Sequence, residues 1–127
     1  MHKHLANDVY RMKNNNPYLG GIPDVWYSGN FQSLWVEYKY VPVAKPTFPV
    51  VPALSAQQLH WILERKKEGR NVWVIVGCKS GGIIFKCEKH ILRGMSVLSF
   101  KSYKEIATEI HSFCHKEPSN ATTKCSP

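Results

Sequence analysis

Residues 20–41 read GGIPDVWYSGNFQSLWVEYKYV and contain three charged side chains within a hairpin-like pattern. Asp24 precedes a short apolar run, and Glu37 and Lys39 lie two positions apart in the next run. Because positions i and i+2 of a strand share a face, Glu37 and Lys39 point the same way. Pairing of the two strands would bring Asp24 beside them. Two carboxylates and an amine at one point are suited to bind a divalent metal ion and activate a water molecule.

The rest of this stretch predicts two antiparallel strands. Val25–Ser28 is a short apolar run, Ser28-Gly29-Asn30 favours a turn, and Leu34–Val41 is a longer run. The longer run alternates between two faces, with Leu34, Val36 and Tyr38 on one and Trp35, Glu37 and Lys39 on the other. Since both faces are apolar except at the charged pair, we expect a central strand that is buried on both sides.

Apolar residues at helical spacing predict three helices. The clearest spans residues 55–68 and opens with Ser55 and Gln58, which form a capping-box pattern. Residues 102–114 open with the same kind of pattern, and residues 3–14 give the third helix.

The remaining segments supply further strands and connections. Residues 71–77 are apolar throughout and predict a central strand, which residues 83–87 would pair with. Residues 88–94 read as a basic connection and residues 95–100 as a short strand. The four prolines of residues 42–54 predict an extended connection. This order of elements predicts an α/β (α+β) fold with a mixed central sheet of four to five strands flanked by helices.

The chain has 127 residues and a formal net charge of +8. This length favours one domain, which we place at residues 1–115, followed by a polar tail at 116–127 that we expect to be disordered. No apolar run is long enough to span a membrane and no secretory signal is visible, so we expect a cytoplasmic protein. The positive charge favours nucleic acid as partner. The four cysteines match no zinc pattern, and we expect reduced thiols.

The charged residues lie in a recognisable arrangement. Ile22-Pro23-Asp24 followed by Glu37-Tyr38-Lys39 resembles the signature of the PD-(D/E)XK nuclease superfamily. With Leu54–Gln58 opening a helix and Val72–Gly77 after it, the chain looks like the small virus-type and replication-repair branch of that superfamily, the VRR-NUC domains. The resemblance covers most of the chain from residue 20 to residue 86 and implies a restriction-endonuclease-like core.

The resemblance implies a role for each matching residue. In that family the Asp and Glu bind Mg²⁺ or Mn²⁺, and the Lys assists the attacking water. Carried over, these are Asp24, Glu37 and Lys39, with the backbone carbonyl of Tyr38 completing the metal shell. Gln58 matches a catalytic glutamine of the family's helix motif, although its capping box alone also explains it.

The family usually has one more acid on its first helix. The acid in the corresponding segment here is Asp8, which borders the apolar stripe of residues 3–14. It would be a third metal ligand, or else an exposed residue favoured by the helix dipole near the N-terminus. Both interpretations remain open at this point.

Basic side chains along the second half of the chain would follow a phosphate backbone. The candidates for this role are Arg65, Lys66, Lys67, Arg70, Lys79, Lys89 and Arg93. The tryptophans at positions 26, 35, 61 and 73 lie in periodic segments, and we interpret them as core residues.

The sequence therefore predicts a Mg²⁺- or Mn²⁺-dependent DNA endonuclease of phage or prokaryotic type, working in the bacterial host if phage-encoded. Stand-alone domains of the family often cut branched DNA as dimers, so we expect a homodimer acting on DNA junctions. One alternative is a nuclease fold that binds nucleic acid or regulates without cleaving. Another is a host-interaction protein, which would rest on the proline-rich segment.

Overall fold

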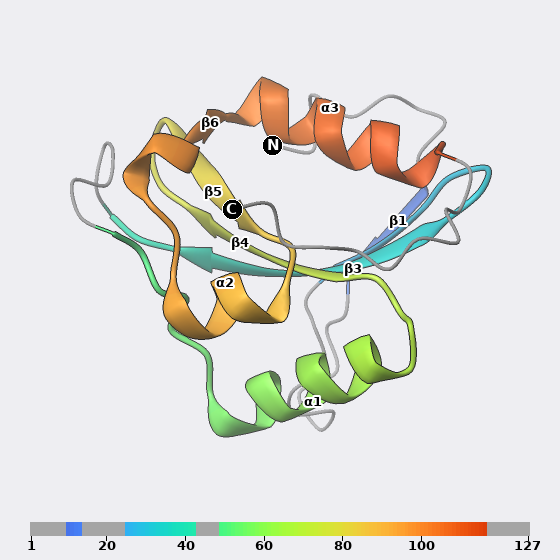
Figure 1. Cartoon of the computed structure of the whole chain (residues 1–127). Coiled ribbons are helices and arrows are strands. Elements are labelled where there is room, and N and C mark those ends of the chain that lie inside the picture. The colour runs from blue at the N-terminus through green and yellow to red at the C-terminus, as the bar shows by residue number, and fades with distance from the viewer. Residues whose placement is uncertain (1–9, 14–24, 43–48, 117–127) are drawn as a thin grey trace.

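The computed structural model describes residues 10–13, 25–42 and 49–116, and these form a mixed sheet with helices on both faces (Figure 1). The sheet has six strands in chain order: β1 (Tyr10–Lys13), β2 (Val25–Ser28), β3 (Ser33–Tyr40), β4 (Val72–Gly77), β5 (Gly81–Phe85) and β6 (Lys101–Ser102). Strands β3 and β4 are parallel, and every other neighbouring pair is antiparallel. The predicted fold class is confirmed, and the short edge strands β1 and β6 extend the expected sheet.

Two helical layers cover the sheet. Helix α3 (Tyr103–Cys114) lies over one face, and α1 (Ala56–Lys67) and α2 (Glu88–Arg93) lie over the other (Figure 1). Because strand side chains alternate between faces, each layer encloses its own apolar cluster. On the α3 side the cluster includes Val36, Ile75 and Ile110, and on the α1 side it includes Ile62 and Val74.

The parallel pairing of β3 with β4 determines where α1 lies. Parallel neighbours need a crossover connection, and a helix that packs on the sheet usually provides it. Helix α1 is that connection, so it runs back along the sheet and starts near the end of β3. Its buried Ile62 packs in the same cluster as Val72 and Val74 of β4.

Both long helices begin as the sequence predicts. Ser55 caps α1 and Ser102 caps α3, and each forms a complete capping box with the residue three positions later. Helix α1 ends at Lys67, and Gly69 follows with a positive φ of 83°, a conformation that glycine adopts without strain.

Three local predictions are wrong. Residues 10–13 form strand β1 instead of part of a helix, because their backbone pairs with β2; the rest of the predicted helix 3–14 lies outside the described residues. The basic connection 88–94 contains helix α2. The expected strand 95–100 instead contains a single bridge from Met95 to Val50 and a 3₁₀ turn at Val97–Ser99. Local patterns cannot reveal the partners that decide such short segments.

The expectation of reduced cysteines is met at two positions. Cys78 and Cys114 are buried and form no disulfide bond. Cys87, at the N-cap of α2, is disulfide-bonded, so the expectation is wrong there. The spacing of cysteines does not determine such a connection. Of the tail predicted at 116–127, residues 117–127 lie outside the described residues, so the expected disorder stays a prediction. Within the described part of the chain, no helix has the length and apolar character needed to cross a membrane.

The attachment of α1 to the sheet can be tested at Ile62. Its side chain is fully buried, so Ile62→Ala leaves a cavity between α1 and β4 and should lower the free energy of unfolding by about 2–5 kcal/mol. Gln57→Ala, at an exposed position of the same helix, should change it by less than about 0.5 kcal/mol. Urea unfolding of the two variants measures both values. Equal effects would contradict the packing described here.

Candidate active site

Glu37 lies in the interior of the protein, on the central strand β3. It is 2% exposed and is the buried charged residue among the described side chains. In the parallel register it lies beside Val74, and Lys39 lies beside Val76. Since both valines pack in the α1-side cluster, Glu37 and Lys39 project toward α1. A buried carboxylate is costly unless polar groups contact it.

Two donors meet the Glu37 carboxylate. The side-chain amide of Gln58 donates a hydrogen bond of 3.0 Å to Oε2. The ammonium group of Lys39 lies 3.4 Å from the same oxygen. Lys39 is 28% exposed at its side chain, so it connects the buried acid to the solvent. The structure therefore brings together three of the residues that the sequence singled out.

Gln58 reaches Glu37 because of its position in α1. It is the third residue of the helix, and its own Oε1 accepts a hydrogen bond of 3.0 Å from the backbone N–H of Ser55. The first turn of α1 contains no acidic residue. The positive end of the helix dipole therefore has Glu37, on a neighbouring strand, as a nearby negative charge. The sequence pattern predicts only a capping role for Ser55. The glutamine at the third helical position is the signal that could have indicated a contact with the site.

Tyr38 points away from this site, to the α3 side of the sheet. Its hydroxyl lies 2.6 Å from the hydroxyl of Tyr27. Burial raises the pKa of Tyr38, and the neighbouring Tyr27 raises it further. The side chain is therefore a neutral part of the core. A metal ion on the Glu37 side could use the backbone carbonyl of this residue and not its phenol.

Asp24 and Asp8 lie outside the described residues. Asp24 is bonded to Val25, and Val25 pairs with Val36, the residue before Glu37. Within the described ranges, no group of three or more His, Cys, Asp or Glu side chains is arranged to hold a metal ion. The described part of the site thus supplies one carboxylate.

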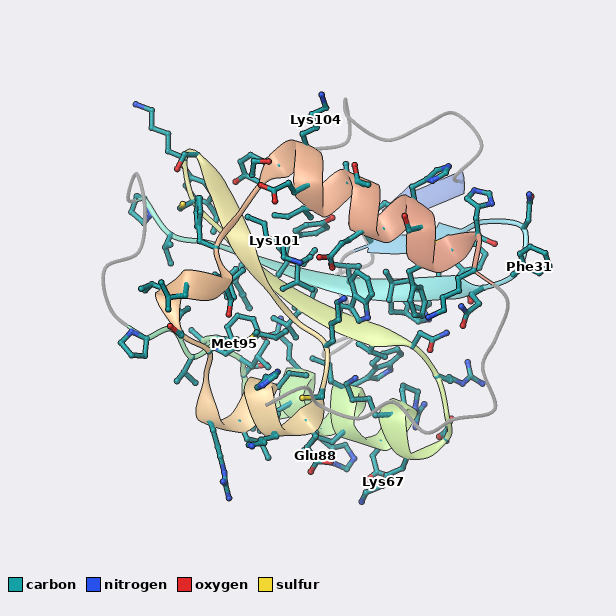
Figure 2. All side chains as sticks on the ribbon, turned by 45° about the horizontal axis from the view of Figure 1, so that its top comes forward. Phe31, Lys67, Glu88, Met95, Lys101 and Lys104 are labelled. Atoms are coloured by element: carbon teal, nitrogen blue, oxygen red, sulfur yellow. The ribbon has the colours of Figure 1, made fainter. Side chains whose placement is uncertain are left out.

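The basic candidates fall into two groups. Those at the end of α1 already have partners: Arg65 and Arg70 pair with Glu68, Lys67 pairs with Glu64, and Lys66 donates to the carbonyl oxygen of Lys86. Lys79, Lys89 and Arg93 are exposed. Figure 2 shows Lys67 on the α1 side of the sheet and Lys104 on the outside of α3.

The interpretation of the tryptophans as core residues is confirmed for Trp73, whereas Trp35 and Trp61 are partly buried against the core and Trp26 is partly buried outside both clusters. Trp73 is 5% exposed, in the α3-side cluster. Trp35 and Trp61 pack against the α1-side cluster with ring centroids 5.7 Å apart. The Trp26 ring lies 6.4 Å from that of Trp35. Trp35 lies on the same face of β3 as Glu37, two positions before it.

Comparison with known proteins supports the fold. The solved Holliday junction resolvase Hjc from Archaeoglobus fulgidus, an archaeal hyperthermophile, matches 81% of this chain and 88% of its own, with a TM-score of 0.53 and 12% sequence identity. No protein-family model matches the chain, and no curated protein gives a significant match. At this identity the likeness shows that the two chains share a fold.

The pH dependence of the free energy of unfolding should reveal the lowered pKa of Lys66. Burial lowers its pKa from 10.5 to about 8, against the opposing effect of Glu88. Between these two values the unfolded chain holds a proton that the folded protein has lost, so the free energy of unfolding rises with pH there. In the wild type this rise in the free energy of unfolding should be on the order of 1–3 kcal/mol, and in Lys66→Met it should be absent. Urea unfolding at pH values across this window measures it.

Lys67→Met is the matched control, because it removes an exposed cation from the same helix. The interpretation fails if Lys66→Met gains as much stability as the wild type when the pH is raised from 8 to 10.5.

Proposed function

We propose that this protein is a divalent-metal-dependent DNA endonuclease of the PD-(D/E)XK superfamily. One observation carries the proposal: a buried carboxylate, Glu37, lies on the central strand within 3.4 Å of Lys39 and 3.0 Å of Gln58. A buried acid with a lysine two positions later on the same face has little structural value at the end of an apolar strand. It is suited to phosphodiester hydrolysis, where an oxygen ligand and a cation must act on one phosphate.

The donor set fits Mg²⁺ or Mn²⁺. Hard cations take oxygen ligands, and Mg²⁺ keeps several waters, so one or two carboxylates with substrate phosphate oxygens suffice. Glu37 and Asp24 would hold the ion, with the backbone carbonyl of Tyr38. Asp24 is next in sequence to Val25, which supports its place in the site. Asp8 remains the candidate for a third carboxylate. When bound, the ion polarises the phosphate and lowers the pKa of a coordinated water.

The other residues act on the substrate and on Glu37. Lys39 is exposed enough to reach a phosphate, and its charge would stabilise the negative charge that develops on the phosphate oxygens. It would also orient the attacking water. Gln58 keeps the Glu37 carboxylate in one orientation through its amide hydrogen bond. A fixed ligand is one part of the preorganisation that hydrolysis needs.

We propose branched DNA as the substrate. The fold is shared with a protein named as a Holliday junction resolvase, and the net charge of +8 suits a large polyanion. Resolving a junction symmetrically requires two cuts, so a homodimer with one site per protomer is the expected assembly. The virus-type branch and a phage source stay predictions.

A second function, DNA binding without cleavage, has one observation in its favour. The described part of the site supplies a single carboxylate, and that carboxylate is in contact with an ammonium and an amide of its own chain. Such a site could bind a phosphate through Lys39 without holding a metal ion. The two functions differ in whether a divalent metal ion is required.

Cleavage assays separate these functions. Purified protein with Mg²⁺ or Mn²⁺ should cut a four-way DNA junction, and EDTA should abolish the cutting. Asp24→Asn, Glu37→Gln and Lys39→Ala should each lower the rate at least about 100-fold, because each removes a ligand or the charge that stabilises the phosphate. Lys104→Ala, on the outside of α3, is the matched control and should cut normally. Junction binding without cleavage under every metal condition would refute the enzyme.

The salt dependence of DNA binding should identify the contacting cations. Each phosphate contact adds about 0.9 to the slope of log affinity against log salt. Single alanine variants of Lys79, Lys89 and Arg93, whose side chains are exposed, should each reduce the slope by about 1. Arg70→Ala should reduce it less, because Arg70 already pairs with Glu68. Fluorescence anisotropy with labelled junction DNA in EDTA measures the slopes; equal effects at all four positions would contradict this division.

A further inference from the structure

We propose that Ser55 is a positioning residue of the active site, acting through Gln58 on Glu37. The inference rests on the proposed nuclease function for its catalytic consequence. Its geometric basis is a continuous set of hydrogen bonds from the helix cap to the buried carboxylate. Ser55 itself is exposed and does not contact Glu37 in any described interaction.

The chain of contacts has three steps. The backbone N–H of Gln58 donates to Ser55 Oγ at 3.1 Å, which closes the first half of the capping box. The backbone N–H of Ser55 donates to Gln58 Oε1 at 3.0 Å, which closes the second half. Gln58 Nε2 then donates to Glu37 Oε2 at 3.0 Å. The Gln58 amide is thus held at both of its ends.

This arrangement admits one orientation of the amide. Rotating it by half a turn would place its NH₂ group against the N–H of Ser55 and its oxygen against the Glu37 carboxylate. Both contacts would be repulsive, since the first would place a donor against a donor and the second an acceptor against an acceptor. The cap therefore decides that a donor, and not an acceptor, faces Glu37.

The second capping box of the protein shows why the residue type matters. At the start of α3, the residue three positions after Ser102 is Glu105, whose Oε1 accepts from the Ser102 backbone at 3.0 Å. A carboxylate has no donor left after closing a box, whereas a glutamine keeps its NH₂ group. The α3 box stabilises a helix start, and the Ser102 hydrogen bonds lower the pKa of the exposed Glu105. The α1 box has the same geometry and a remaining donor, which it directs to Glu37.

The two boxes provide a matched experiment. Ser55→Ala and Ser102→Ala each remove the hydroxyl cap of a 12-residue helix, so both should lower the melting temperature to a similar degree. NMR of the metal-free, isotopically labelled protein then monitors the side-chain NH₂ group of Gln58. Ser55→Ala keeps the backbone N–H that donates to Gln58 Oε1 but removes the hydroxyl that accepts from the Gln58 backbone N–H. The first turn of α1 is then less firmly held, so hydrogen exchange of the Gln58 side-chain amide with water should speed at least about tenfold. Ser102→Ala should leave this exchange at the wild-type rate.

Junction cleavage supplies the second measurement. Ser55→Ala should lower kcat roughly 10- to 100-fold with little change in KM, because a misplaced Glu37 affects the reaction more than substrate binding. Ser55→Thr should have the Gln58 exchange rate and the kcat of the wild type, since threonine also caps helices. Ser102→Ala should retain wild-type kcat.

The outcomes are distinguishable. If Ser55→Ala and Ser102→Ala have the same Gln58 exchange and the same kcat, Ser55 is only a helix cap and the inference is overturned. If the wild type does not cleave but Ser55→Ala alone loosens the Gln58 amide, the nuclease proposal fails and the positioning of Gln58 by Ser55 stands. If the wild type cleaves and Gln58 exchange does not respond to Ser55→Ala, the nuclease stands and the positioning role is refuted.

Discussion

The parallel pairing of β3 with β4 is the constraint on which the rest of the structure depends. Parallel strands cannot be joined by a tight turn, so the chain must return across a face of the sheet. Helix α1 makes that return, and it must therefore begin near the end of β3 where Glu37 and Lys39 lie. The helix N-terminus, with Ser55 and Gln58, reaches the charged pair as a consequence of topology.

The buried charge makes this meeting point informative. A carboxylate in an apolar layer destabilises the fold unless donors surround it, and the described donors are a lysine from the same strand and an amide from the facing helix. Replacing one donor with an apolar group would leave the charge less well compensated, which costs more than a typical hydrogen bond contributes. A structure that only needed stability could use a valine here, as β4 does at Val74. The buried acid at this position is therefore the observation on which the proposed function rests.

Much of this could be predicted from the sequence, because the patterns concerned are local. The alternation of residues 34–39 gave the two faces of β3, and the serines at 55 and 102 marked both helix starts. The predictions failed where long-range partners decide. Residues 10–13 become a strand by pairing with β2. The sequence singles out both Gln58 and Glu37, but not the hydrogen bond that joins these positions 21 apart. The pairing of Arg65 and Arg70 with Glu68 is local, and assigning these residues to DNA by charge alone overlooks it.

The same topological constraints explain how a fold can be shared at 12% identity. The parallel pair, its crossover helix and the alternation of apolar side chains constrain residue classes and not particular residues, so most positions can change without loss of the architecture. Under the proposed nuclease function, the positions whose chemistry matters are those at which the strand end meets the helix start. In this chain they are an acid and a lysine on β3 and a glutamine held by its cap on α1. Because three such positions are too few to dominate a sequence comparison, a chain can share this fold and match no family model.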